Sequence, residues 1–556
     1  MTLKEKISEA LSEALSEAIT DGTLPAAQFP PFKIEYPKEQ KFGDYATTFA
    51  METAKVLRKS PLDTAAKLLP YIEKHAVVER AEIANPGFIN IFVAAGELTA
   101  AVRAAIAEDT AYGRQTKEQP AHINIEFVSA NPTGPMNIVS ARAAALGDTI
   151  ANIFEAAGDN VEREFYVNDY GNQVHLLGLS VLSRIREAKG EPTEFPEEGY
   201  HGEYVKDIAG YIMREHKDKL DALAKDEAAL VDFCAETAVE YNVAKQKKDL
   251  NAFNVNFTRW FREKSLHASG DVDETFKLLQ SKGCVYEQDK KIFFKSTAYG
   301  DDKDRVIIRD DGRPTYLLAD IAYHRNKIER GYDKIIDIWG PDHHGYISRL
   351  SGAVEAIGFH RDKFKVLIAQ QVNLVLEGET VKMSKRLGNF STMEELVEEI
   401  GADVARYFFI MRSMESHLDF DLALAKKDSS ENPVFYLQYA HARICSLFRE
   451  AESRGVAYKR GSFNDACLAD DECVQLMKLI AKYPEEIADA AQSIEPHRLP
   501  AFLLKLAQSY HRFYTEHRVL TDDIEKTNAY LNLCDAVRKV MSNGLRLLGV
   551  SAPEKM

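Results

Sequence analysis

The sequence predicts an α/β protein built around a doubly wound parallel sheet, with a small α+β domain before it and an all-α domain after it. A strand, a tight loop and a helix follow one another within residues 123–154. Strand patterns recur at residues 161–167, 334–339 and 365–370, and from Pro433 onward only helical patterns recur. Alternating strands and helices form parallel sheets, whose ligands bind at the carboxyl ends of the strands.

The composition is that of an ordinary folded protein. The 556 residues are 45% hydrophobic and 28% charged, and chains of this length hold about three or four domains. Because the chain has 70 Lys and Arg residues and 86 Asp and Glu residues, its net charge is −16. This charge argues against a surface that is cationic overall and binds any nucleic acid, although a local basic patch is still compatible with it.

The first domain is predicted to span residues 1–115. Apolar residues at steps of four within residues 3–19 predict a helix, which the turn at Asp21-Gly22 ends. A second helix is expected near residues 46–58. A strand is expected at residues 88–92, after an Asn-Pro-Gly turn.

The other two domains are predicted at residues 120–430 and 433–556. Residues 190–300 are highly charged and mostly helical in pattern, and they lie between strand-loop-helix units. We therefore expect them to form an insertion in the central domain. The last domain repeats apolar residues at helical spacing, as at Leu503, Leu506, Tyr510 and Phe513.

Cysteine usage and the N-terminal segment predict a cytoplasmic protein that does not enter a membrane. The N-terminal segment has no uninterrupted apolar run, and no later stretch approaches the ~20 apolar residues of a membrane span. No cysteines form a Cys-x-x-Cys pair, which favours a reducing compartment, buried thiols and no structural zinc. The six cysteines are Cys234, Cys284, Cys445, Cys467, Cys473 and Cys534.

One compact cationic loop carries Lys382, Ser384 and Lys385. Two ammonium groups and a hydroxyl suit a polyphosphate, whose charge grows as pyrophosphate leaves. Lysines in such loops are also common on solvated surfaces, but the order Lys-Met-Ser-Lys favours the phosphate interpretation. Thr392 and Glu395 predict a helix that opens with a capping box directly after this loop.

Two further loops directly follow predicted strands. The loop at residues 127–135 precedes a helix whose N–H groups could face a phosphate, although such loops are also common without a ligand. Residues 339–345 contain His343 and His344, which invite a metal interpretation. Adjacent side chains point apart, and no carboxylate lies at helical ligand spacing, so we expect no metal there.

Tyr316 and Asp320 lie four residues apart, on one face of a predicted helix. A carboxylate beside a phenol could hold a cation such as a guanidinium group. A solvated acid near a helix start fits this pattern equally well.

Several short motifs follow one another in a fixed order along the chain. They are Lys41-Phe42-Gly43-Asp44-Tyr45, Asn85-Pro86-Gly87-Phe88-Ile89-Asn90, Glu126 to Gly134, Tyr166 to Gln173, Asp320 to His324, Asp342 to Tyr346, Lys382 to Arg386, Tyr439 to Arg443 and Ala552 to Met556. In this order the motifs resemble those of bacterial arginyl-tRNA synthetases, which are class I aminoacyl-tRNA synthetases. The resemblance covers essentially the whole chain.

The resemblance implies a Rossmann-like catalytic domain that condenses L-arginine with ATP to arginyl-adenylate and then transfers the arginyl group to its tRNA. It implies an N-terminal domain that contacts the tRNA and a helical C-terminal domain that reads the anticodon. The expected partners are arginine tRNA isoacceptors, L-arginine and ATP. Mg²⁺ is expected to accompany ATP rather than to occupy a protein cage, and we expect a monomer.

The resemblance also implies roles for individual residues. The expected catalytic residues are Lys382, Ser384 and Lys385. The residues expected to bind ATP are Pro132, Gly134, Asn137, Ser140, Lys382, Met383 and Lys385. The residues expected to surround arginine are Glu126, Asn131, Tyr316, Asp320 and His344.

The second signature of class I synthetases, His-Ile-Gly-His, reads Asn137-Ile138-Val139-Ser140 in this chain. Asn137 still offers an amide donor and Ser140 a shorter hydroxyl. Val139 is expected to place a β-branched side chain where adenine lies against the backbone.

Four interpretations of this change stay open. The chain is a family variant whose loop has shifted, a synthetase with little activating activity, or a non-catalytic tRNA-binding protein on the same fold. The fourth is a ligase that activates an arginine-like substrate for a different acceptor.

Overall fold

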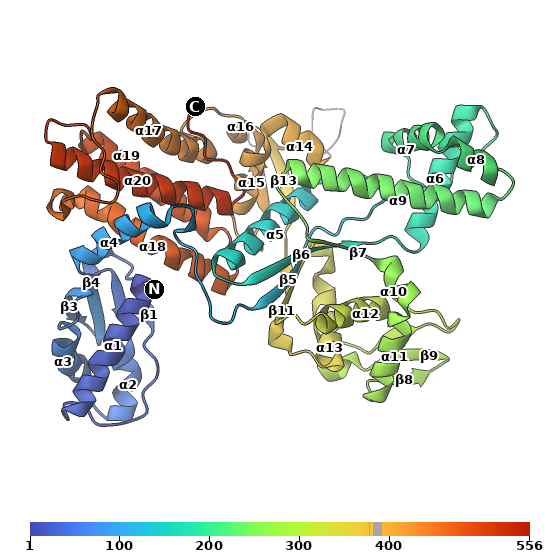
Figure 1. Ribbon diagram of the computed structural model, residues 1–556. Helices are drawn as coiled ribbons and strands as arrows, with labels where there is room; N and C mark the ends of the chain where they lie inside the picture. Colours follow the sequence, from blue (N-terminus) through green and yellow to red (C-terminus); the bar gives the residue numbers. More distant parts are fainter. Residues whose placement is uncertain (377–378, 382–391) are drawn as a thin grey trace.

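The computed structural model describes residues 1–376, 379–381 and 392–556 (Figure 1). The N-terminal domain lies at one end, where its helix α4 packs against α18 and α20. Helices α17 to α20, which form the last domain, pack beside the central sheet.

The N-terminal domain is an antiparallel sheet covered by helices. Its elements are α1 (Leu3–Thr20), β1 (Ile34–Glu35), β2 (Tyr45–Thr47), α2 (Phe49–Leu57), α3 (Pro61–Ile72), β3 (Val78–Ala84), β4 (Phe88–Val93) and α4 (Ala95–Glu108). The strand order is β1-β2-β4-β3. The predicted first helix is confirmed, and Thr2 and Glu5 close a capping box at its start. The predicted strand at residues 88–92 is confirmed as β4.

The central sheet is parallel and has five strands. They are β5 (His122–Glu126), β6 (Asn160–Val167), β7 (Arg259–Arg262), β11 (Lys334–Trp339) and β12 (Phe364–Ile368). The order β12-β11-β5-β6-β7 means that the chain leaves β5 in one direction, through β6 and β7, and returns on its other side with β11 and β12. The sheet is therefore doubly wound and Rossmann-like, as predicted. Its topological switch point lies between β5 and β11.

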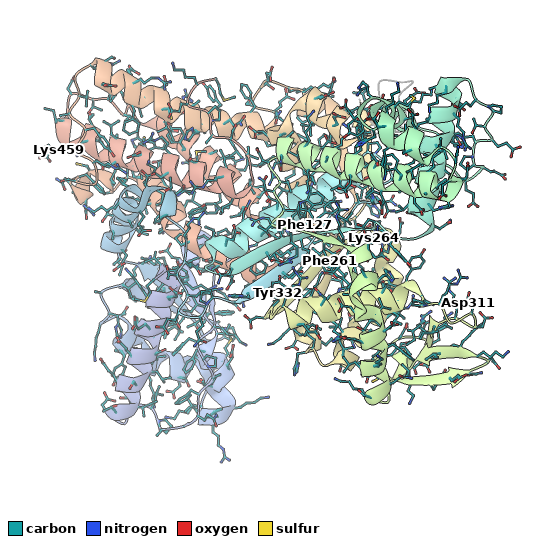
Figure 2. All side chains as sticks on the ribbon, turned by 45° about the vertical axis from the view of Figure 1, so that its right-hand side comes forward. Phe127, Phe261, Lys264, Asp311, Tyr332 and Lys459 are labelled. Carbon is teal, nitrogen blue, oxygen red and sulfur yellow. The ribbon has the colours of Figure 1, made fainter. Side chains whose placement is uncertain are left out.

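Helices on the sheet have apolar faces that the strands bury. They include α5 (Ile138–Ala156), α12 (Tyr316–Glu329) and α13 (Ile347–Ile357), whereas α6 (Asn172–Lys189) packs against α7 and α9. Phe127, labelled in Figure 2, is fully buried where β5 ends. A side chain at Gly147 of α5 would lie 2.3 Å from the Phe127 ring, so this close approach of helix to strand requires glycine.

Residues 190–300 differ from the predicted helical insertion. They contain helices α7 (Glu203–Glu215), α8 (Lys217–Leu223), α9 (Glu227–Ala252), α10 (Glu263–Ser269) and α11 (Asp271–Ser281) and strands β7, β8 (Val285–Gln288) and β9 (Lys291–Phe294). With β10 (Arg305–Ile308), β8 and β9 form a small antiparallel sheet, whereas β7 is the edge strand of the central sheet. Trp260 of β7 stacks on Phe165 with ring centroids 4.3 Å apart. The strand β7 has only four residues, of which the first and last are arginines, so it is too short to give a strand pattern in the sequence.

A small sheet and a set of helices complete the chain. They are β13 (Val372–Leu376), β14 (Glu379–Val381), α14 (Met393–Ile400), α15 (Ala402–Ile410), β15 (Leu418–Asp421), α16 (Leu422–Ala425), α17 (Pro433–Ser453), α18 (Asp471–Ser493), α19 (Arg498–Glu516) and α20 (Ile524–Leu547). The described residues after Pro433 contain no strand, in agreement with the prediction. The capping box of Thr392 and Glu395 at the start of α14 is confirmed.

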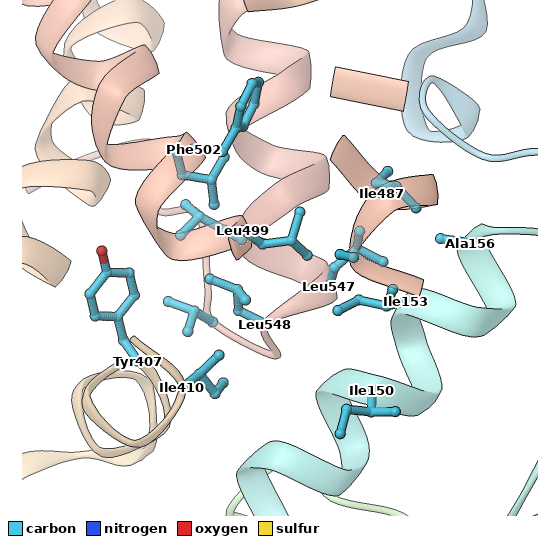
Figure 3. Packing of buried hydrophobic residues seen from close by; sticks show 14 of the residues in the cluster. Ile150, Ile153, Ala156, Tyr407, Ile410, Ile487, Leu499, Phe502, Leu547 and Leu548 are labelled. Atoms are coloured by element: carbon cyan, nitrogen blue, oxygen red, sulfur yellow. The ribbon is translucent and has the colours of Figure 1, made fainter. Parts of the chain in front are cut away.

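An apolar core joins α5 to the C-terminal helices. Figure 3 shows Ile153 of α5 near Leu547 of α20 and Ile487 of α18, with Ile150 further along α5 in the same cluster. Because these side chains belong to one continuous buried cluster, the last domain is packed directly onto the central domain.

Arg406 of α15 is a buried cation at this junction. Its guanidinium group donates to the carbonyl of Leu548, to the carbonyls of Phe253 and Asn254, and to the carboxylate of Asp148 at 2.7 Å. A side chain at Gly549 would lie 2.4 Å from this guanidinium group. Arg406 therefore binds α5, the end of α9 and the end of α20 to one another.

Two further findings concern the chain as a whole. Within the ranges that the structure describes, no helix is both long and apolar enough to cross a membrane. All six cysteines are free thiols; Cys467 is partly exposed and the others are buried.

Candidate functional site

A cleft of about 820 Å³ opens where β5 and β11 end, at the switch point of the sheet. The residues lining it include Glu126, Ser129, Asn131, Thr133, Gly134, Asn137, Ser140, Tyr166, Asn168, Tyr200, Tyr204, Asp320, Tyr323, His324, Asp337, His343 and Tyr346. They come from the loops after β5, β6 and β11, from α12 and from the segment that leads into α7. Most of these side chains are polar, which suits a charged, polar ligand.

The loop after β5 has an unusual backbone. Val128 and Ser129 have φ values of 69° and 40°, in the left-handed region that non-glycine residues rarely adopt. The Ser129 hydroxyl donates to Glu126 Oε1 at 2.9 Å and accepts from the backbone N–H of Tyr166 at 3.1 Å. These bonds hold the strained turn in place beside the cleft.

A buried ammonium group lies beneath the cleft. Lys327 of α12 is fully buried, and its Nζ donates to Glu126 Oε2 of β5 at 2.6 Å and to Asp337 Oδ1 of β11 at 2.8 Å. Burial alone would lower the pKa of Lys327, but attraction to Asp337 and Glu126 outweighs it and raises this pKa. His324 Nε2 lies 2.8 Å from Asp337 Oδ2. Lys327 is therefore charged and holds α12 to both strands.

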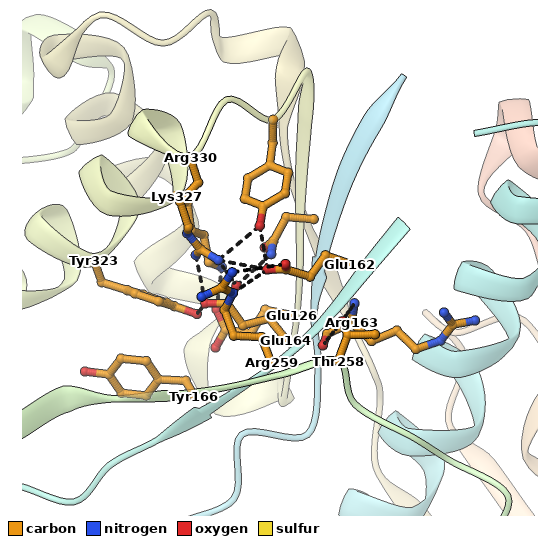
Figure 4. A network of polar contacts seen from close by, with 12 residues as sticks. Glu126, Glu162, Arg163, Glu164, Tyr166, Thr258, Arg259, Tyr323, Lys327 and Arg330 are labelled. Atoms are coloured by element: carbon orange, nitrogen blue, oxygen red, sulfur yellow. Dashed lines mark hydrogen bonds and ion pairs between the residues drawn. The ribbon is translucent and has the colours of Figure 1, made fainter. Parts of the chain in front are cut away.

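The carboxyl groups of this cluster respond in opposite directions. Burial favours the neutral acid, but attraction to Lys327 and His324 lowers the pKa of Asp337 to about 2. Burial dominates for Glu126 and raises its pKa. A neighbouring carboxylate, Glu164, accepts from the hydroxyl of Tyr323 at 2.7 Å and from Arg330 at 2.6 and 2.9 Å (Figure 4).

Asp320 is an acid of the cleft that has no charged partner among the described residues. Its Oδ2 accepts from the hydroxyl of Tyr346 at 2.5 Å, and among the described residues no Lys, Arg or His nitrogen lies within ion-pair distance of its carboxylate. Burial raises the pKa of Asp320 to about 6, and repulsion from Glu126 and Asp337 adds to this rise. The cleft therefore offers a carboxylate that a cationic ligand would stabilise.

The start of α5 forms another edge of the cleft. Asn137 caps this helix: its Oδ1 accepts from the backbone N–H of Ser140 at 2.9 Å and from the Ser140 hydroxyl at 3.2 Å. The Ser140 hydroxyl is thus already donating, which differs from its expected role as a donor to a ligand. Val139 is half-buried and does not line the cleft. We expected the side chain of Val139 to obstruct the site, but in this geometry it does not.

The structure gathers part of the predicted site. Glu126, Asn131, Gly134, Asn137, Ser140 and Asp320 all line the cleft. Pro132, Tyr316 and His344 do not line it: Pro132 is buried, Tyr316 is 69% exposed and His344 is exposed. Lys382, Met383, Ser384 and Lys385 lie outside the described residues.

Sequence reasoning missed several residues of the cleft and its floor. One signal was available, because Asp337 is a lone acid between two isoleucines of β11. Lys327 carried no such signal, since a lysine near a helix end is normally solvated. The residues missed are Tyr166, Tyr200, Tyr204, Tyr323, His324, Lys327, Asp337, His343 and Tyr346.

The residue types near the cleft do not form a metal cage. Across the described ranges, no group of three or more His, Cys, Asp and Glu side chains is arranged to hold a metal ion. The carboxylates beneath the cleft are instead occupied by Lys327 and His324.

Comparison with known proteins gives matches along nearly the whole chain. The model of the class I (R) tRNA synthetase catalytic domain matches residues 101–412. The arginyl tRNA synthetase N-terminal domain model matches residues 1–93, and the DALR anticodon-binding domain model matches residues 437–556.

Individual relatives agree with these models. The arginine–tRNA ligase of Leptospira interrogans is 48% identical, with 94% of this chain and 93% of that protein covered. The arginine–tRNA ligase of Bacillus licheniformis is 42% identical, with 96% of each covered. A solved structure described as a putative arginyl-tRNA synthetase of Campylobacter jejuni is 35% identical, covers 84% of this chain and all of its own, and has a TM-score of 0.76.

Replacing Lys327 by Met tests the buried ion cluster. Because Lys327→Met leaves the carboxylates of Glu126 and Asp337 without their cation, we expect the free energy of unfolding to fall by about 3–5 kcal/mol. Urea denaturation followed by tryptophan fluorescence measures this loss. Lys365→Met, at an exposed position of β12, is the control and should change the free energy by less than about 0.5 kcal/mol. Equal stability of the two variants would contradict the assigned role of Lys327.

Proposed function

The chain belongs to the arginyl-tRNA synthetases of class I, and from this premise we propose how its residues carry out the reaction. The protein is an arginine–tRNA ligase, which uses ATP to join L-arginine to its tRNA through arginyl-adenylate. The relatives give no support to the alternative of a non-catalytic tRNA-binding protein. Catalysis proceeds by positioning of the two substrates and by phosphate electrostatics, without a covalent enzyme intermediate.

Asp320 is the residue that binds the guanidinium group of arginine. The observation that carries this assignment is its carboxylate, which faces the cleft and has only the Tyr346 hydroxyl as a side-chain partner among the described residues. Glu126 and Asn131 line the same cleft and supply further acceptors. Since Lys327 offsets only part of the negative charge beneath the cleft, a cationic side chain is favoured there.

Tyr316 and His344 belong to the same proposed arginine site as residues of its rim. Neither side chain lines the cleft, and both are exposed. We therefore assign them contacts that form when arginine binds.

ATP occupies the part of the cleft next to the start of α5. Support comes from Asn137, whose amide group lies at the cleft, and from the first N–H groups of α5, which are suited to phosphate oxygens. Gly134 and Ser140 line the cleft and complete this proposed ATP site, and Pro132 lies buried in the loop just before Gly134. Lys382, Met383, Ser384 and Lys385 are assigned to the ATP phosphates and the departing pyrophosphate, with Mg²⁺ entering together with ATP.

The two outer domains bind tRNA. We assign residues 1–115 to the tRNA elbow, residues 120–430 to the chemistry and residues 433–556 to the anticodon. The last assignment is supported by Tyr439, which is 41% exposed and stacks on His511 with centroids 6.0 Å apart. Arg443 lies 4.2 Å from the ring centroid of the nearby Tyr514. Exposed aromatic rings beside a guanidinium group are typical of surfaces that bind single-stranded nucleotides.

The proposed setting is the cytoplasm, where the protein acts as a monomer. Six free thiols fit a reducing compartment.

Charging and exchange assays test the function. With arginine, ATP and cognate tRNA, we expect labelled pyrophosphate to exchange into ATP and labelled arginine to become attached to the tRNA, while lysine in place of arginine supports neither. Exchange without charged tRNA would indicate a ligase with another acceptor. Tight tRNA binding without exchange would overturn the assignment as a synthetase.

The pH dependence of arginine binding tests Asp320. Burial raises the pKa of this group to about 6 in the ligand-free protein, and only the ionised form attracts guanidinium. The Kd for arginine should therefore be constant above pH 7 and rise by up to about tenfold for each pH unit below pH 6. In Asp320→Asn, binding at pH 8 should weaken by about 3 kcal/mol or more, and the pH dependence should disappear. Calorimetry measures both effects, and Asp310→Asn, at an exposed position, should behave as the wild type.

Variants of Asn137 separate its cap from its contact with phosphate. Asn137→Asp keeps the helix cap but replaces the amide donor by a negative charge. We expect the melting temperature to stay within about 1 °C and the rate of adenylate formation to fall by about 10²–10³-fold. Val139→Ala, outside the cleft, should change the rate by less than about threefold. An unchanged rate in Asn137→Asp would remove Asn137 from the ATP site.

A further inference from the structure

Helix α9 reaches the back of the cleft. It is 26 residues long and runs from α7 and α8 towards α14 (Figure 1). Asn242, Lys245 and Gln246 have the spacing i, i+3 and i+4, so they lie on one face of this helix. Asn242 and Gln246 are only 4% and 1% exposed, and neither lines the cleft.

Two buried amides bind the backbone of the loop after β5. Asn242 Nδ2 donates to the carbonyl of Pro132 at 2.8 Å, and Gln246 Nε2 donates to the carbonyl of Asn131 at 3.1 Å. These are consecutive carbonyls of the loop that carries Asn131 and Gly134 into the cleft. Because Val128 and Ser129 hold the same loop in left-handed backbone, its position depends on such external bonds.

The third residue of this face binds a different element. Lys245 Nζ lies 2.7 Å from Glu394 Oε2 in the first turn of α14. The backbone N–H of the adjacent Met393 donates to the carbonyl of Met136, at the far end of the same loop, at 2.9 Å. The loop is thus held by α9 at residues 131–132 and by α14 at residue 136, and Lys245 connects the two helices.

We propose that Asn242, Lys245 and Gln246 are positioning residues for adenylate formation. They act through backbone carbonyls and through α14, and they determine the positions of the Asn131 side chain and the Gly134 backbone in the cleft. This inference rests on the proposed function, since its readout is the synthetase reaction. A displacement of about 1 Å in such a loop is enough to cost about 10²-fold in rate.

Isosteric variants test the two amides. Asn242→Asp and Gln246→Glu keep the shape of the side chain, but an ionised carboxylate cannot donate to a carbonyl and repels it. In pyrophosphate exchange with cognate tRNA, we expect kcat/KM for arginine to fall by about 10–100-fold in each variant, with a higher KM. The matched control is Asn251→Asp, an exposed amide on the same helix, which should retain wild-type constants.

The split between KM and kcat distinguishes positioning from loss of folded protein. Partial unfolding lowers the apparent kcat in proportion to the inactive fraction and leaves KM unchanged, so the fraction of active sites is titrated for every variant. A variant with fewer active sites but an unchanged KM, or one with wild-type kcat/KM, overturns the proposal. If the wild-type protein itself shows no exchange, the proposed function fails rather than this inference.

The pH profile of Asn242→Asp provides a second readout. A protonated aspartic acid can donate to the Pro132 carbonyl, so the activity of the variant relative to the wild type should rise as the pH falls from about 8 to about 5.5. Other titratable groups around this position are Tyr204 and Asp207 of α7, Tyr241, Lys245 and Asp249 of α9, and Glu394 of α14. All are present in both proteins, so the part of their titration that the new carboxylate leaves unchanged cancels in the ratio. A flat ratio contradicts the proposed hydrogen bond.

A charge exchange tests Lys245 without altering a buried amide. Lys245→Glu places a carboxylate beside Glu394, and we expect kcat/KM to fall by about tenfold. Adding Glu394→Lys restores an ion pair of reversed polarity and should recover at least half of the lost activity on a logarithmic scale. If the double variant is no more active than Lys245→Glu alone, the link between α9 and α14 has no role in positioning.

Discussion

The ammonium group of Lys327 is the interaction on which the geometry of the cleft depends. In a doubly wound sheet, neighbouring loops diverge and leave a crevice where the strand order reverses. In this chain that point lies between β5 and β11. Glu126 at the end of β5 and Asp337 in β11 place two carboxyl groups at that point, and Lys327 of α12 forms an ion pair with both. Without a cation there, two buried acids on adjacent strands would repel each other, and one of them would have to take up a proton. Because Lys327 is committed to these two acids, Asp320 on the same helix is left with an unpaired carboxylate. Helix α12 thus carries both Lys327, whose charge stabilises the fold, and Asp320, whose charge is available to a ligand.

Buried polar contacts also fix the outer domains relative to the cleft. At one junction Arg406 bonds to backbone carbonyls of Phe253 and Leu548 and to Asp148. At another, Glu485 of α18 accepts from the hydroxyls of Tyr36 and Tyr45 in the N-terminal domain. Such contacts are directional, so they fix the orientation of one domain against the next more narrowly than apolar packing alone. The two outer domains and the cleft are thereby held at fixed separations in a protein with a net charge of −16.

Local patterns predicted the elements that bury one clear face. The first helix, the strand β4, the parallel strands β5, β6, β11 and β12, and the capping box before α14 all have such patterns. The strand β7 was missed because its four residues depend on tertiary stacking of Trp260 on Phe165 rather than on alternation. Within the site, motifs located the loop after β5 and Asp320. They could not reveal Lys327, Asn242 or Gln246, since a lysine or an amide on a helix normally faces water, and only the packing of distant segments buries these side chains.

The altered signature at the start of α5 illustrates how backbone can replace side chains. In the expected pattern two imidazoles donate to phosphate, whereas here the Oδ1 atom of Asn137 is occupied by Ser140. Among the described residues, the amide nitrogen of Asn137 has no acceptor, so it remains available at the cleft.

The N–H groups of Ile138 and Val139 belong to the first turn of the helix, where no partner exists within the helix itself. Their direction and the positive end of the helix dipole both favour an anion at this position. The chain therefore lacks the two imidazole donors of the expected pattern, but it keeps an amide group and a helix N-terminus at the volume of the cleft. The half-buried side chain of Val139 stays outside that volume. A phosphate site at this helix start is consequently compatible with Asn-Ile-Val-Ser, because the helix terminus that it requires is set by the cap that Asn137 retains.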